Sequence, residues 1–313
     1  PVFINDYVIV FISRLLLGVG VGLFNNLAYS LIMAVYEGEE RQTMLGFQSA
    51  VGTVGNALAS FVVGLLISNG WQVAFNVNWL FVIPLVLFGL FATKIDQFTN
   101  PVVTETGDTV PIKAKETTNM AVVGYVLLIA TFFAFYFGLL LKLAGFLVEQ
   151  HLGTAAVAAT QLSVMSLIGL LPSLLYGQIY KHLRRLTIPI GLIITGLGIG
   201  IIATAGTLTM TWIGIVISGF GLPIVMPAIF GKVAEVQPEG SSNLSSALML
   251  VGINVAVFLS PQVLAVTTQI IGQTSNKATM LVSTVMLFVL GAIQLVMATT
   301  KKQPIKNRSE MKS

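Results

Sequence analysis

Nine apolar runs, each long enough to cross a membrane, follow one another along this chain of 313 residues. A helix needs roughly 20 mostly apolar residues to span the hydrocarbon core of a bilayer. The sequence therefore predicts an all-α polytopic membrane protein with about nine transmembrane helices. The predicted spans are Val8–Val35, Thr43–Ile67, Val77–Thr93, Met120–Val148, Val157–Tyr180, Leu186–Ala205, Trp212–Phe230, Leu244–Val266 and Ala278–Ala298. The run from Leu186 to Phe230 is almost uninterrupted, but its 45 residues are twice the length of one crossing. It is therefore divided into two spans at Gly206–Thr211.

The scarcity of charge supports this prediction. Only 9% of the residues are charged and 55% are hydrophobic, whereas a soluble domain carries about 25% charged residues. Such a chain cannot cover a water-facing surface, so its surroundings must be largely lipid. The absence of cysteine excludes disulfides and thiolate metal sites.

The distribution of lysine and arginine predicts the orientation, because cytoplasmic loops carry an excess of both residues. With the C-terminal tail placed in the cytoplasm, 13 of the 16 basic residues fall on the cytoplasmic side and only Lys277 falls outside. The 13 are Arg41, Lys94, Lys113, Lys115, Lys181, Arg184, Arg185, Lys232, Lys301, Lys302, Lys306, Arg308 and Lys312. The sequence thus predicts a multi-pass protein of the cytoplasmic membrane with a cytoplasmic C-terminus. Because the positive charge sorts by loop, it indicates topology rather than a nucleic-acid partner.

A weak internal repeat predicts two halves. Glu39–Ser60 resembles Glu239–Ser260, with Gly52 opposite Gly252, and this alignment pairs the first three spans with the last three. Transporters often contain such repeats. We therefore expect residues 1–93 to form the remainder of an N-terminal half, 94–119 a cytoplasmic linker, 120–300 a C-terminal half of six helices, and 301–313 a basic cytoplasmic tail. Equal halves would require three further spans before Pro1, giving nine helices present of twelve; the alternative is a native nine-helix protein that begins outside.

Four segments resemble the major facilitator superfamily. Arg14–Gly22 is similar to the Arg-x-x-x-Gly-x-Gly pattern of the fourth helix in that family, and Glu37–Arg41 to the turn before its fifth helix. Gly70–Phe75 resembles the Gly-Trp-Arg-x-x-Phe entry to the sixth helix, and Gly177–Arg185 the basic loop after the eighth. The resemblance implies a major-facilitator-type helical bundle in which this chain supplies helices four to twelve.

The sequence also departs from the patterns of that family. Lys181 and His182 replace an acidic residue and an arginine in the basic loop, and Arg184 replaces a glycine. Ala59-Ser60 stands where antiporters of the family have Gly-Pro, which argues against assignment to the antiporters.

Two basic residues lie inside predicted spans, where a charge is costly and tends to face a bundle interior or a cavity. The resemblance implies that Arg14 supports ion coupling or the gating of helix contacts; the alternative is interfacial anchoring by snorkelling. Lys142 lies toward the outer face, where it either snorkels or helps to attract an anionic substrate into a cavity.

Uncharged polar residues within spans are the other candidates for a transport site. Gln48 and Asn56 are eight residues apart, hence nearly on one helix face, and we expect both to take part in transport. Further candidates for the cavity wall are Asn25, Tyr136 and Asn254. Hydrogen bonds between helices are the competing explanation for each of these residues.

Small residues in the second span predict close helix packing. Gly52, Gly55 and Ala59 follow the small-x-x-x-small pattern, which lets helix backbones approach each other. Gly52 also keeps the face between Gln48 and Asn56 narrow.

These observations predict a secondary active transporter that moves a small organic solute across the cytoplasmic membrane by alternating access, with drug or metabolite efflux as examples. The expected partners are the lipid bilayer, a small-molecule substrate and a coupling ion, either a proton or sodium. The sequence contains no phosphate-binding loop and no clustered catalytic side chains, so we expect no enzyme activity, cofactor or metal. The alternative function is a non-transporting polytopic membrane protein, either a degenerate carrier or a receptor.

Overall fold

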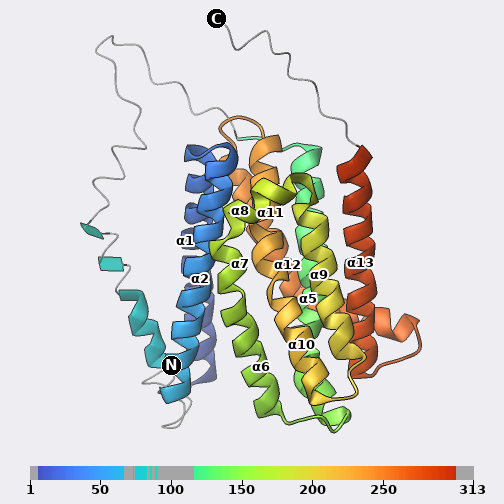
Figure 1. Cartoon of the computed structure of the whole chain (residues 1–313). Coiled ribbons are helices and arrows are strands. Elements are labelled where there is room, and N and C mark those ends of the chain that lie inside the picture. The colour runs from blue at the N-terminus through green and yellow to red at the C-terminus, as the bar shows by residue number, and fades with distance from the viewer. Residues whose placement is uncertain are drawn as a thin grey trace, which may run out of the picture.

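The computed structural model describes residues 6–66, 73, 75–82, 85–86, 89–90 and 116–300. These residues are almost all helical, and no strand occurs among them. The helices are α1 (Tyr7–Val35), α2 (Gly38–Leu66), η2 (Phe75–Phe81), α5 (Met120–Glu149), α6 (Ala155–Ile168), α7 (Leu170–Leu174), α8 (Tyr176–Leu183), η3 (Arg184–Leu186), α9 (Thr187–Ala203), α10 (Leu208–Gly219), α11 (Gly221–Val236), α12 (Ser242–Ile270) and α13 (Asn276–Thr300). They form an elongated bundle of roughly parallel helices (Figure 1).

Seven helical stretches of the described residues are long and apolar enough to cross a bilayer. They are Tyr7–Val35, Met120–Glu149, Ala155–Leu174, Tyr176–Ala203, Leu208–Val236, Ser242–Ile270 and Asn276–Thr300. The second predicted span corresponds to α2, which has the same length as α1 but begins with the charged residues Glu39, Glu40 and Arg41. Of the third predicted span, Val77–Thr93, the structure describes residues 77–82, 85–86 and 89–90, and the first five of these belong to η2. The prediction of an all-helical polytopic membrane protein is confirmed.

The helices run between two ends of the bundle, which we name by the helices found there. At the α8 end, α1 and α13 finish and α2, α5 and α12 begin; at the α6 end, α6, α10 and α13 begin (Figure 1). Asn119 joins neighbours at the α8 end: its side chain accepts a hydrogen bond from the Val122 amide and donates one to the Val236 carbonyl. The apolar stretch Tyr176–Ala203 is not one straight crossing, because the chain reverses within it between α8 and α9 at Arg184, whose φ of 45° lies in the left-handed region (Figure 1).

Two crossings of the bundle are broken, each just before a proline. Proline has no N–H, so the carbonyl four residues earlier loses its helical partner. Accordingly α6 stops at Ile168, four residues before Pro172, and α10 stops at Gly219, four residues before Pro223. The breaks lie against each other, because a Cβ added at Gly169 would come within 3.0 Å of the Pro223 ring.

The two N-terminal helices contact the rest of the bundle unevenly. Among the described side chains of α1, the buried ones are Tyr29, Ser30 and Met33, which lie in its last third, at the α8 end. Along α2, Leu45 near the α8 end is fully buried, whereas Val51 is 72% exposed. The N-terminal pair is therefore packed against the other helices at the α8 end and lies apart from them further along.

Candidate functional site

A cavity of about 310 Å³ lies where α1 and α2 separate from the helices opposite. It is lined by Tyr29, Gln48, Ser49, Gly52, Thr53, Asn56, Tyr136, Met165, Ser166, Gly169, Gly219, Leu222, Pro223 and Met226. This central cavity is at the lower end of the roughly 300–1,000 Å³ range of ligand sites. It draws its walls from α1 and α2 on one side and from α5, α6, α10 and α11 on the other.

One face of α2 forms the first wall. Besides Gln48 the lining residues of α2 are Ser49, Gly52, Thr53 and Asn56, and at about 100° per residue these five positions fall within an arc of about 140° around the helix. A Cβ added at Gly52 would meet no described atom within 4 Å. Gly52 therefore widens the cavity rather than bringing α2 against another helix.

The broken helices form the opposite wall. Gly169, Gly219 and Pro223, which mark the two breaks, all line the cavity. Interrupted membrane helices are tolerated where they are buried in protein or line a water-filled cavity, and in transporters they often mark the substrate site. The cavity thus lies where the two breaks leave backbone carbonyls without their helical partners.

The polar lining has unused hydrogen-bonding capacity. The Gln48 Oε1 atom is buried and has no hydrogen-bond partner among the described residues. An orphaned buried acceptor of this kind costs about 1–3 kcal/mol, a cost that a ligand donor in the cavity would remove. No Asp, Glu, Lys, Arg or His occurs in the described lining.

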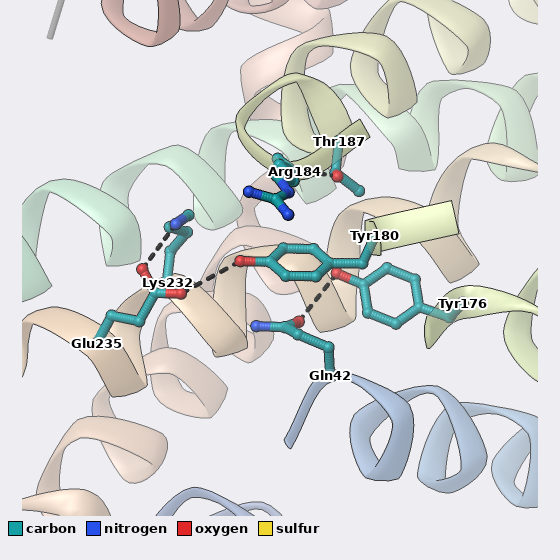
Figure 2. Close-up of polar contacts among 7 residues, drawn as sticks. All are labelled: Gln42, Tyr176, Tyr180, Arg184, Thr187, Lys232 and Glu235. Carbon is teal, nitrogen blue, oxygen red and sulfur yellow. Dashed lines mark hydrogen bonds and ion pairs between the residues drawn. The ribbon is translucent and has the colours of Figure 1, made fainter. Parts of the chain in front are cut away.

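The α8 end of the cavity is closed by direct contact between α2 and α8 (Figure 2). The Tyr176 hydroxyl on α8 donates a hydrogen bond of 3.1 Å to Gln42 Oε1 on α2, and both side chains are buried. A Cβ added at Gly231 on α11 would collide with the Gln42 amide, and one added at Gly177 would collide with Thr43. Glycines on α8 and α11 therefore let α2 approach closely at this end.

A second set of polar contacts joins α8 to α11 beside this closure (Figure 2). The Tyr180 hydroxyl donates to Glu235 Oε1 at 3.2 Å, and the Lys232 ammonium lies 2.6 Å from Glu235 Oε2. The Tyr180 ring lies 6.2 Å from the Tyr176 ring, measured between centroids. These contacts fix the face of α8 that meets α2.

The first helix is joined to α11 and α12 at the same end. Asn26 donates to Asn243 Oδ1 and accepts from the Ser246 hydroxyl, both at 2.6 Å. The Tyr29 and Phe230 rings stack with centroids 4.1 Å apart. Contacts between the N-terminal pair and the other helices thus gather on the α8 side of the cavity.

The structure brings some of the predicted site residues together and separates others. Gln48, Asn56 and Tyr136 line one cavity, although they come from α2 and α5. The Arg14 guanidinium instead lies 4.3 Å from the centroid of the Phe75 ring, outside the described cavity lining. Asn254 donates to the Leu250 carbonyl of its own helix at 2.8 Å.

The remaining candidates also differ from expectation. Lys142 lines a second cavity between α5, α12 and α13, and the side chain of Asn25 lies outside the described residues. Gly55, predicted to pack against a helix, faces open space among the described residues, and Ala59 is half-buried. The close approaches of α2 are made elsewhere: a Cβ added at Gly46 would lie 2.8 Å from the Tyr176 Cβ.

Several residues of the closed end were missed by the sequence reasoning. Nothing in the sequence alone distinguishes Gln42, Tyr176 or Gly231. Gly177, by contrast, begins the basic segment that resembles the loop after the eighth helix of the major facilitator superfamily. In the described part of the chain, no three His, Cys, Asp or Glu side chains gather as a metal site would require.

The fold and cavity define a polytopic helical membrane protein built like a membrane carrier. The sequence matches the profile described as Major Facilitator Superfamily over residues 1–261. The chain belongs to this superfamily of secondary transporters, as the resemblance implied.

Comparison with solved structures agrees on the fold. The structure matches the major facilitator superfamily proton:xylose symporter XylE bound to 6-bromo-6-deoxy-D-glucose, with a TM-score of 0.64 and 14% sequence identity. The match covers 90% of this chain and 69% of the symporter chain. No curated protein sequence is significantly similar to this chain.

Proposed function

We propose that the protein moves a small organic solute without net charge across the cytoplasmic membrane by alternating access. The observation that carries the proposal is the central cavity, which combines one unsatisfied buried acceptor, Gln48 Oε1, with no charged side chain in its described lining. Residues 1–93 and 120–300 would act as two groups that rock about this cavity, joined by the linker 94–119. The basic tail 301–313 and the α8 end would face the cytoplasm.

The position of the closure supports alternating access. The Tyr176–Gln42 contact lies on one side of the cavity, and α2 is exposed on the other side from Val51 onward. These two observations support the proposal that this state is shut toward the α8 end. Separation of α2 from α8, with approach of the two groups at the α6 end, would give the opposite state.

Individual residues would have distinct roles. Gln48 and Asn56 on α2 and Tyr136 on α5 would hydrogen-bond the solute. Arg14 would act in gating, because its contact with Phe75 links α1 to η2. The described cavity lining holds no carboxylate or imidazole that could relay a proton. Coupling to protons or sodium is therefore tested by the imposed gradients and is not assigned to a residue.

The test is solute uptake by the purified protein in proteoliposomes, under an imposed pH or sodium gradient. Radiolabelled xylose, glycerol and uridine serve as uncharged probes, with glutamate and lysine as charged ones. We expect accumulation of at least one uncharged probe and a loss of that uptake in Gln48→Leu. Uptake confined to the charged probes would reject the proposed substrate class, and absence of uptake by a folded protein for every probe would reject the function.

A further inference from the structure

A second cavity lies apart from the central one, between α5, α12 and α13. It measures about 340 Å³ and shares no lining residue with the central cavity. Its walls are Leu141, Lys142, Pro261, Ala265, Thr268, Gln269, Thr274 and Thr279. Thr274 follows α12 at the α6 end of the bundle, and Lys142 lies seven residues before the last residue of α5, about 10 Å along the helix.

Lys142 has no counter-ion in the described part of the chain. The nearest carboxylate along α5, Glu149, accepts hydrogen bonds from the backbone amide and the side-chain amide of Asn276, at 3.2 and 2.9 Å. Glu149 thus holds the end of α5 to the start of α13. The Lys232–Glu235 ion pair lies at the opposite end of the bundle.

An ammonium group within the span needs an anion or water. Charged side chains inside membrane segments usually pair with another charge or face a wet cavity, and Lys142 is half-buried against this one. Gln269 beside it makes no side-chain hydrogen bond among the described residues and offers two N–H donors. One positive charge and a free amide therefore face the same space.

The lining changes with depth. Polar and cationic residues lie toward the α6 end, whereas Pro261 and Ala265 lie further into the span. A ligand that matches both parts has an oxyanion at the shallow end and an apolar group below it. A phospholipid of the leaflet at the α6 end has this form, and free phosphate shares its oxyanion chemistry.

We propose that Lys142 and Gln269 bind a phosphate group in this cavity, as a site separate from solute transport. The proposal does not depend on the proposed function. Lys142 supplies the charge and Gln269 supplies N–H donors, while the apolar depth accepts the first carbons of an acyl chain.

The test measures binding to the delipidated full chain in a neutral detergent. Native mass spectrometry follows phosphatidylglycerol, and equilibrium dialysis follows radiolabelled inorganic phosphate, which distinguishes the lipid source from the free ion. The variants are Lys142→Gln, Lys142→Arg and, as matched control, Lys277→Gln. Lys277 is an exposed lysine at the same end of the bundle that does not line the cavity.

We expect Lys142→Gln to weaken phosphatidylglycerol binding about tenfold, the factor that corresponds to one charge-assisted contact, while Lys142→Arg and Lys277→Gln bind as the unmodified chain does. A Lys142-dependent signal with inorganic phosphate alone would keep the site and assign it to the free ion. Equal binding by Lys142→Gln and the unmodified chain in both assays would overturn it. If Lys142→Gln does not fold, Gln269→Leu gives a second test with a smaller expected loss, because it changes an exposed position and retains Lys142.

Discussion

The Tyr176 hydroxyl on α8 donates a hydrogen bond to the Gln42 side chain on α2, and this buried pair joins helices that lie 134 residues apart in sequence. Both side chains occupy the narrow crossing created by Gly46 on α2 and Gly231 on α11. The pair therefore reports whether the α8 end of the central cavity is closed.

The hydrogen bond between these two residues can be measured by a double-mutant cycle. We expect Gln42→Ala and Tyr176→Phe to show a coupling energy of about 0.6 kcal/mol, the average for polar pairs between membrane helices. The measurement is equilibrium unfolding in mixed micelles. Gln42→Ala combined with Tyr180→Phe is the control, because Tyr180 bonds Glu235 instead. Equal couplings in the two cycles would mean that the Gln42–Tyr176 bond is not formed.

The glycine at position 177 predicts a way to open the α8 end. Gly177→Val places a side chain against Thr43, and we expect it to separate α2 from α8. The chain has no cysteine, so Ser49→Cys supplies a single thiol on the central cavity for an impermeant maleimide. Labelling from the α8 end should rise in Gly177→Val.

The matched control for that experiment is Gly124→Val, because a Cβ at Gly124 meets no described atom within 4 Å. This variant should leave Ser49→Cys labelled from the α6 end only. If Gly177→Val and Gly124→Val are labelled alike, the close approach at Gly177 does not control access.

The sequence predicted the helices because membrane spans are set locally, by runs of apolar residues. The division near Gly206 was confirmed, with α9 ending at Ala203 and α10 beginning at Leu208. The turn at Arg184 also falls within the basic loop that was predicted to lie between two spans. Such features need no knowledge of how the helices cross.

Contacts between helices were less predictable, because crossing geometry decides them. Gln48 and Asn56 could be placed on one face from their spacing, but nothing local showed that Tyr136 would lie across the same cavity. The spacing of Gly52 and Gly55 suggested packing, yet the close approach of α2 depends on Gly177 and Gly231 from other helices. Asn254 donates to its own backbone, and α12 contributes no residue to the described lining of the central cavity.

The orphaned acceptor on Gln48 predicts a loss of solute affinity when it is removed. Gln48→Leu should weaken binding of a transported uncharged solute up to about tenfold, since one hydrogen bond between uncharged groups contributes roughly 0.5–1.5 kcal/mol. Equilibrium exchange in proteoliposomes gives the half-saturating concentration. Gln294→Leu on α13, which lies outside the cavity lining, is the matched control and should have no effect. A similar change in both variants would exclude Gln48 from the solute site.

We expect substitution of Arg14 to slow transport more than substitution of Lys142. Arg14→Ala removes a cation–π contact worth about 0.5–1 kcal/mol at an exposed site and releases α1 from Phe75, so we expect the transport rate to fall. Lys142→Ala should change it less, because Lys142 lies on the second cavity. Initial uptake rates at equal protein density measure both. Equal, mild losses would reduce Arg14 to an interfacial anchor.

Removal of the break between α10 and α11 should stabilise the protein and slow transport. Pro223→Ala restores the N–H that can reach the Gly219 carbonyl, and it removes the ring that lies near Gly169. We expect the free energy of unfolding to rise by about 1 kcal/mol, the net contribution of one hydrogen bond, and the rate of uptake to fall because a continuous helix bends less easily at the cavity. Pro227→Ala is the control, since Pro227 lies inside α11 without interrupting it. If both variants keep the rate of the unmodified protein, the break serves packing alone and plays no part in opening the cavity.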